Sequence, residues 1–144
     1  MTEEQLEKIN WLNRAFHAEK NAKAWLAKLE RDRSIAERLG SSLGGGLSGG
    51  KSNSTEDALI HLAQTETETR ERLHELVGIR EEISSAIRNV DDPDMQAILV
   101  RHYLAYETFE TIADKMHYSI RSIKYKHKAA LDKVCIVLHP QSVV

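Results

Sequence analysis

The chain of 144 residues contains very few residues that break helices. Pro93 and Pro140 are its only prolines, and Gly78 is its only glycine outside residues 40–50. Because proline and glycine are the residues that most often end a helix, their scarcity predicts long uninterrupted helices. Aromatic residues make up 6% of the chain and charged residues 29%, a balance that suits solvent-exposed helices better than a thick globule.

Cysteine occurs once, at Cys135, which excludes an internal disulfide and fits a reducing cytoplasm. The N-terminal MTEEQLEKIN lacks the basic start and the apolar run of a signal peptide. No stretch of the sequence approaches the ~18 consecutive apolar residues of a membrane span. We therefore expect a cytoplasmic protein without a membrane segment.

Acidic and basic side chains are segregated along the chain, although the formal net charge is only −2. Residues 54–94 carry eleven acidic and four basic side chains, whereas residues 115–133 carry six basic side chains and one acidic one. A compact basic block of this kind is typical of a segment that binds a polyanion. The charge pattern therefore directs attention to the C-terminal part of the chain.

Residues 3–39 are predicted to form one amphipathic helix that ends at Gly40. Apolar side chains recur there at three- and four-residue steps, and several alanines favour helix. The apolar stripe consists of Leu6, Ile9, Leu12, Phe16, Leu26 and Leu29. Residues 40–53, GSSLGGGLSGGKSN, have the small and flexible composition of a linker.

A second long helix is predicted to begin at Ser54 and to run to residue 90. Its stripe follows alternating three- and four-residue steps, with Glu66 and Arg80 as interruptions. The stripe consists of Leu59, Leu62, Thr69, Leu73, Leu76, Ile83, Ile87 and Val90. Residues 1–90 are therefore predicted to form an antiparallel helical hairpin, and a dimeric coiled coil built from the same stripes is the open alternative.

Residues 91–144 are predicted to form a separate domain of three shorter helices. The first spans residues 94–105, with Asp92 as its cap and Pro93 at its first position. The second, FETIADKM at 109–116, follows Thr108 as its cap. The third begins after a break at residues 117–118, with Ser119 as its cap, and continues to about Leu138. Its predicted buried face consists of Ile123, Leu131, Val134 and Leu138.

The last two of these helices have the layout of a helix-turn-helix. Ile112, Ala113 and Ile123 are expected to hold the two helices at a steep angle, because the small Ala113 permits a close approach. The outer face of the second helix would then be free to enter the major groove of DNA. This face presents Arg121, Lys124, Tyr125 and Lys128 at three- and four-residue spacing, with Ser122 beside them.

The stretch FETIADKMHYSIRSIKYKHKAAL at 109–131 resembles the region 4 helix-turn-helix of sigma-70 factors. It resembles even more closely the matching segment of small Gram-positive phage and prophage transcriptional regulators, the ArpU/RinA-like late regulators. The matching positions are Phe109, Ile112, Ala113, Ser119, Ile123, Ala130 and Leu131. The preceding QAILVRHYLAYETF resembles the first helix of the same module, with Leu99, Arg101 and Tyr103 at its characteristic positions.

This resemblance implies a DNA-binding transcriptional regulator of phage or prophage genes, located in the cytoplasm of a bacterial host. Carried over by position, the base-facing places fall on Ile120, Arg121, Lys124 and Tyr125. Ile120 stands where sigma factors usually have a polar or basic residue, so their promoter preference is not carried over. The candidate DNA-binding residues are Ser119, Ile120, Arg121, Ser122, Lys124, Tyr125 and Lys128.

The expected partners are double-stranded DNA, RNA polymerase and a second copy of the chain as a homodimer. No cofactor, metal ion or catalytic residue is expected, and the chain is not expected to be an enzyme. Two rival functions remain open. One is the DNA-recognition subunit of a phage packaging machine, similar to a small terminase, and the other is a protein-interaction module whose basic helix binds an acidic protein.

The segment GGGLSGGKS at 44–52 matches two phosphate-binding patterns, G-x-G-x-x-G and G-x-x-x-x-G-K-[ST]. A phosphate loop needs a buried strand before it, whereas this segment follows the charged stretch RDRSIAERLG. We therefore interpret it as the turn of the hairpin. Cys135 and His139 are spaced as half a metal site, but no second pair of ligands has suitable spacing, so a packed cysteine is the better interpretation.

Overall fold

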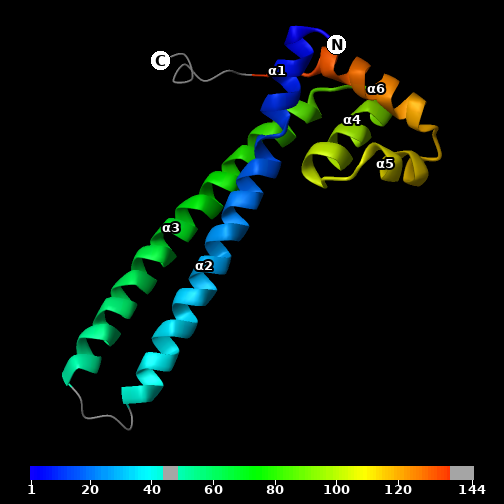
Figure 1. The fold of residues 1–144 in the computed structure, drawn as a ribbon. Helices are drawn as coiled ribbons and strands as arrows, with labels where there is room; N and C mark the ends of the chain where they lie inside the picture. Colours follow the sequence, from blue (N-terminus) through cyan, green and yellow to red (C-terminus); the bar gives the residue numbers. More distant parts are fainter. Residues whose placement is uncertain (44–48, 137–144) are drawn as a thin grey trace. The chain divides into compact units, whose positions relative to one another are not determined.

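Every regular element in the described parts of the chain, residues 1–43 and 49–136 of a computed structural model, is a helix (Figure 1). The predicted all-α fold is thus confirmed. In chain order the elements are α1 (Glu3–Leu12), α2 (Arg14–Leu43), α3 (Gly49–Arg88), α4 (Pro93–Leu99), the π-helical turn η1 (Val100–Leu104), α5 (Phe109–Met116) and α6 (Ile120–Lys133). None of these helices is both long enough and apolar enough to cross a membrane.

The chain forms two compact units. The hairpin unit is Ala18–Val77, and the terminal unit combines Met1–His17 with Gly78–Val144. The sequence predicts a boundary at residue 90. In the structure, the first turns of the chain and the end of α3 belong to the terminal unit. The long helices α2 and α3 each contribute residues to both units.

The hairpin unit consists of α2 and α3, which lie side by side in opposite directions (Figure 1). Thr69 donates its hydroxyl to the Trp25 carbonyl at 3.3 Å. Thr65 donates to the carboxylate of Asp32 at 2.6 Å and accepts from the Lys28 ammonium at 2.8 Å. The predicted antiparallel hairpin is confirmed, and polar contacts between threonines of α3 and side or main chains of α2 fix its register.

The two long helices extend into the segment predicted as a linker. Helix α2 continues through Gly40 to Leu43, and α3 begins at Gly49, so the predicted helix stop at Gly40 and the predicted helix start at Ser54 are both wrong. Glycine and serine cost a helix at most about 1 kcal/mol each relative to alanine. Continued backbone hydrogen bonding offsets that cost. The centre of GGGLSGGKS, residues 44–48, lies outside the described residues.

The predicted single helix over residues 3–39 is interrupted at Asn13, where α1 ends and α2 follows. The Trp11 carbonyl there accepts the Nε–H of Arg14 at 3.0 Å. A side chain that enters the backbone ladder is one of the usual causes of a bend in a helix. Arg14 also forms an ion pair with Glu82 of α3 at 2.8 Å, which holds its guanidinium in this position.

The core of the terminal unit joins α1 and the end of α3 to the C-terminal helices. Its fully buried members include Leu12, Ile83 and Leu131. The remaining buried members are Trp11, Ala15, Ala86, Ile87, Val90, Leu99, Tyr103, Ala130 and Val134. Polar contacts add to this packing, because Lys8 donates to the Leu131 carbonyl at 2.8 Å and Gln5 donates to Asp132 at 2.9 Å.

Arg80, which interrupts the predicted stripe of the second long helix, has a specific partner in the terminal unit. Its guanidinium donates to the Leu104 carbonyl at 3.1 Å and to the Tyr106 hydroxyl at 2.8 Å. Leu104 is the last residue of η1, where the helix leaves carbonyl groups without partners inside the helix. A charged residue at an apparently apolar position thus stabilises the end of the π-helical turn.

Helix α6 ends at Lys133, so the predicted end near Leu138 is wrong. Val134 has extended backbone angles, and its side chain is buried in the core of the terminal unit. The sequence after Lys133 includes Val134 and Ile136, whose β-branched side chains have low helix propensity. Leu138 and His139 lie outside the described residues.

Candidate nucleic-acid interface

Helices α5 and α6 and the three residues between them form the predicted helix-turn-helix (Figure 1). Each helix begins at the predicted hydroxyl cap. The Thr108 hydroxyl accepts the backbone N–H of Thr111 at 3.2 Å, and the Ser119 hydroxyl accepts that of Ser122 at 3.1 Å. These caps satisfy backbone donors that a helix leaves free at its first turn. Local side chains therefore determine where the candidate recognition helix starts.

A small apolar cluster holds α5 against α6. Ile112, Ala113 and Ile123 are buried together with Ile98 of α4, as the sequence predicts for the first three. Phe109 and Met116 pack at the edge of this cluster. Since Ala113 has no side chain beyond Cβ, the two helices can approach closely, and the opposite face of α6 remains open.

The turn between the helices passes through His117, which has a left-handed backbone conformation with φ 60° and ψ 41°. The N–H of Tyr118 donates to the Ala113 carbonyl at 3.0 Å, which closes the end of α5. This is the position at which helices commonly end in glycine, because a Cβ atom is disfavoured there. His117 is exposed, so its side chain adds little packing to offset that cost.

Substituting His117→Gly is therefore expected to raise the free energy of unfolding by about 0.5–1 kcal/mol. His117→Ala is the matched control, because it removes the same imidazole but keeps the Cβ in the left-handed conformation. Urea unfolding of the three proteins measures the difference. Equal stability of the glycine and alanine variants would contradict a conformational cost at this residue.

The predicted DNA-binding residues lie at the start and along the open face of α6. Arg121, Lys124 and Lys128 are exposed, and Tyr125 is 76% exposed, which is unusual for a large aromatic side chain. Ile120 is 40% exposed at the first turn. The Ser119 hydroxyl and the Ser122 amide are occupied in the cap described above, so these two residues also serve the helix itself.

The six basic side chains of residues 115–133 fall into two groups. Lys115 forms an ion pair with Glu107, and Lys126 forms one with Asp94 at 3.6 Å while it lies over the Tyr118 ring at 4.9 Å. In the described part of the chain, no ion pair or hydrogen bond involves the side chains of the other four. These four are Arg121, Lys124, Lys128 and Lys133. The sequence alone shows all six as equivalent, whereas the structure leaves four cations available to an external anion.

A buried polar pair supports the face of α6 that is turned to the core. The Tyr103 hydroxyl and His127 Nε2 lie 2.6 Å apart, and the rings of His102 and Phe109 contact His127. Burial raises the pKa of Tyr103 and lowers the pKa of His127 to about 4, to which nearby His102 adds a smaller effect. At neutral pH the hydrogen bond therefore joins an un-ionised tyrosine hydroxyl and a neutral imidazole.

Acidification is expected to destabilise the protein through His127. Its pKa is about 4 in the folded state and about 6.5 in the unfolded chain, so the unfolded state binds more protons between these values. The stability of the folded state is therefore complete above pH 6.5 and is lost as the pH falls towards 4, by roughly 3 kcal/mol. Urea unfolding of wild type and His127→Gln at pH 7 and pH 4.5 measures this effect. An equal loss of stability in both proteins would contradict the assignment.

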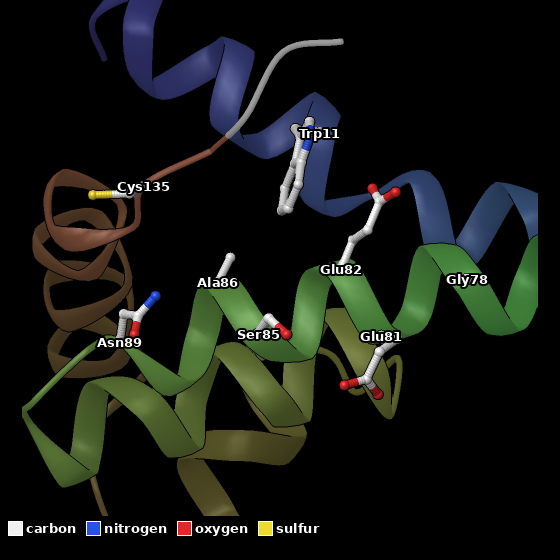
Figure 2. A pocket seen from close by; sticks show the side chains of 8 residues that line it. All are labelled: Trp11, Gly78, Glu81, Glu82, Ser85, Ala86, Asn89 and Cys135. Atoms are coloured by element: carbon white, nitrogen blue, oxygen red, sulfur yellow. The ribbon is translucent and has the colours of Figure 1, made fainter.

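A pocket of about 520 Å³ lies in the terminal unit between α1 and the end of α3 (Figure 2). The carboxylates in its lining already have cationic partners, since Glu82 pairs with Arg14 at 2.8 Å and Glu81 with Arg88 at 3.4 Å. The described lining therefore offers no pair of groups placed for acid–base chemistry. Within residues 1–43 and 49–136, no three His, Cys, Asp or Glu side chains gather where they could hold a metal ion.

Cys135 lies at the edge of this pocket, and its sulfur points away from Trp11 (Figure 2). The residue is exposed, so the interpretation of Cys135 as a packed cysteine is wrong. Helix α6 ends two residues earlier, and the extended backbone that follows buries Val134 instead. Consecutive side chains of an extended segment point to opposite sides, which directs Cys135 outwards.

The fold is thus that of an all-α protein that combines a long helical hairpin with a C-terminal helix-turn-helix. The chain belongs to DUF1492, a family of proteins of unknown function, whose model matches residues 42–135. The match covers α3 to α6 and leaves α1 and almost all of α2 outside it. No curated protein and no solved structure matches the chain.

Proposed function

We propose that the chain is a sequence-specific DNA-binding transcriptional regulator of phage or prophage genes. The observation that carries the proposal is the open face of α6, where Arg121, Lys124 and Lys128 are exposed and free of ion pairs within the described residues. Their spacing along α6 places them on one side of the helix, opposite buried Ile123 and Ala130. Cations held in this way on a rigid helix suit the regular spacing of phosphates along a duplex.

Each of these residues has a distinct role in the proposed complex. The major groove of B-DNA is wide enough to admit α6, and lysines neutralise phosphates at its edges without reading sequence. Arg121 lies in the first turn of α6, where its guanidinium can donate two hydrogen bonds to a guanine. Tyr125 supplies an aromatic surface one turn further along, suited to apolar contact with a thymine methyl group.

The hairpin unit has a separate role in this proposal, namely oligomerisation or contact with RNA polymerase. The proposed activity is binding alone, and no catalytic step or cofactor enters it. In support of this division of roles, the basic side chains of α6 belong to the terminal unit, whereas residues 18–77 form the hairpin unit.

Enrichment of bound duplexes from a random DNA pool, with the full-length chain, tests the proposal. We expect recovery of a common motif a few base pairs long per copy of α6, since a single recognition helix reads a short site. Recovery of duplexes without a shared motif would support DNA binding but contradict its sequence specificity. Failure to retain any duplex would contradict the proposed function and favour an acidic protein as the partner of α6.

A further inference from the structure

The buried side chains of the described hairpin unit are small or polar, and five of its large apolar side chains are exposed. Among the residues whose burial the structure describes, those buried in this unit are Ala22, Ala36, Thr65 and Thr69. Its exposed large apolar residues are Leu26, Leu59, Ile60, Leu73 and Val77. Helices in proteins are stabilised mainly by burial of an apolar face, and in the hairpin that burial is partial, since large side chains such as Leu29, Ile35 and Leu62 are only half-buried. The hairpin therefore has an apolar surface that remains without a partner within the described chain.

Three of these five exposed residues lie on one side of α3. Leu59, Leu73 and Val77 lie about a quarter of a turn from Thr65 and Thr69, the residues that face α2. This side contains, in order, Leu59, Ala63, Glu66, Arg70, Leu73 and Val77, at alternating steps of four and three residues. This spacing keeps a single side of a helix aligned with a neighbouring helix. We refer to these six residues as the α3 strip.

Two opposite charges lie at the middle of the α3 strip. Within the described residues, Glu66 and Arg70 make no ion pair or hydrogen bond, although each is one turn from the other on the same helix. On another side of α3, by contrast, Arg72 pairs with Glu68 at 2.7 Å and with Glu75 at 3.8 Å. A carboxylate and a guanidinium are thus available at the centre of an apolar surface.

The order of residues in the α3 strip allows two copies of it to pair in opposite directions. When a second copy runs in the opposite direction, Leu59 meets Val77, Ala63 meets Leu73, and Glu66 meets Arg70. Each pair then occurs twice, which is the arrangement that a two-fold symmetric interface requires. We propose that two copies of this chain associate through α3, antiparallel, with a two-fold axis level with Glu68.

The order of residues favours a second copy over a foreign protein. In a two-fold dimer, the residues at equal distances on either side of the axis must be complementary to each other. Binding to a protein of different sequence imposes no such requirement on the α3 strip. A parallel pair would place Glu66 on Glu66 and Arg70 on Arg70, and like charges at such contacts are destabilising. Exposed Leu26 of α2 lies about a quarter of a turn from the face of α2 that contacts α3. Because α2 and α3 are antiparallel, this places Leu26 on the same side of the hairpin as the α3 strip. Helices α2 and α3 of both copies then form a four-helix bundle.

This interface gives a specific surface to the oligomerisation proposed for the hairpin, and it does not depend on DNA binding. The mass of the full-length chain in solution, measured by light scattering or sedimentation without DNA, tests it directly. We expect about twice the 16.4 kDa of one chain. Leu73→Glu, which places a carboxylate against Ala63 of the other copy, is expected to give the mass of one chain at the same concentration.

Charge reversal tests the antiparallel alignment. Glu66→Arg or Arg70→Glu alone creates two like-charge contacts per dimer and is expected to weaken association by about tenfold or more. The double variant restores opposite charges in every contact and is expected to recover the dissociation constant of the wild type. Glu71→Arg is the matched control, because it makes the same substitution on an exposed side of α3 away from the strip and should leave the mass unchanged.

Three results would overturn the interface. The first is a wild-type mass of one chain at tens of micromolar protein. The second is a dimer or a larger ring whose mass Leu73→Glu does not change. The third is a double charge variant that associates no better than the single ones while circular dichroism shows equal helix content. Loss of DNA binding with an intact dimer would contradict the proposed function only, so the two failures are distinguishable.

Discussion

Replacing Arg121, Lys124 and Lys128 together with alanine is expected to weaken binding to duplex DNA by roughly a hundredfold at about 0.15 M salt. All three side chains are exposed on α6 and have no ion pair in the described structure, so each can displace a counterion from a phosphate. The loss of three such contacts removes their share of the counterion-release free energy. Because none of the three contributes to the core, the helix content and the unfolding transition should be unchanged. Fluorescence anisotropy with a labelled duplex measures the affinity.

The matched control for this variant replaces Lys20, Arg31 and Arg33 with alanine. It removes the same number of positive charges from exposed positions of α2, in the hairpin unit. If α6 forms the interface, the control loses only the small effect of a more negative net charge. Equal losses of affinity in the two triple variants would show that the net charge, not the face of α6, determines binding.

Leu12→Ala is expected to lower the free energy of unfolding by about 3 kcal/mol, a large part of the stability of a small protein. Leu12 is fully buried in the core that joins α1 to the C-terminal helices. Truncation removes apolar contacts and leaves a cavity between α1 and helices that lie far from it in the sequence. Chemical denaturation followed by circular dichroism measures this change.

Leu6→Ala is the control, because it makes the same substitution in the same helix at a residue that is 50% exposed. We expect a loss of stability below about 0.5 kcal/mol for this variant. Similar effects of the two substitutions would contradict the packing of α1 on the terminal unit. A folded and equally stable chain that lacks residues 1–17 would contradict it as well.

The helix-turn-helix could be predicted in detail because its determinants are local. The caps at Asp92, Thr108 and Ser119 each act within one helical turn, and the structure places all three as predicted. The small cluster around Ile112 and Ile123 also follows from helical spacing over short distances. Local hydrogen bonds and periodicity are the features that a single sequence records best.

The place of α1 could not be predicted, because its partners lie at the other end of the chain. Lys8 and Gln5 appear in the sequence as ordinary polar residues of a solvated helix. In the structure both are buried and donate hydrogen bonds to residues of α6. An apolar stripe indicates that a helix is covered on one side, but it contains no information on which distant segment covers it.

The long stripe of α3 shows the same limitation in a different form. Its periodicity predicts a single seam, whereas the structure divides the stripe. Ile83 lies in the buried core of the terminal unit, while Leu59 and Leu73 lie at the surface of the hairpin unit. The two charged interruptions proved informative, because Arg80 binds the end of η1 and Glu66 lies at the centre of the proposed α3 interface.

The salt dependence of DNA binding by the full-length chain is the most direct test of the central claim that α6 binds duplex DNA. In the described structure, four cations of α6 have no ion pair, and each phosphate contact contributes about −0.9 to the slope of log K against log salt. We therefore expect a slope near −4 between about 50 and 200 mM salt. The triple variant of Arg121, Lys124 and Lys128 should reduce this slope to about −1. Binding that is absent for every duplex, or a slope that the triple variant leaves unchanged, would contradict the account.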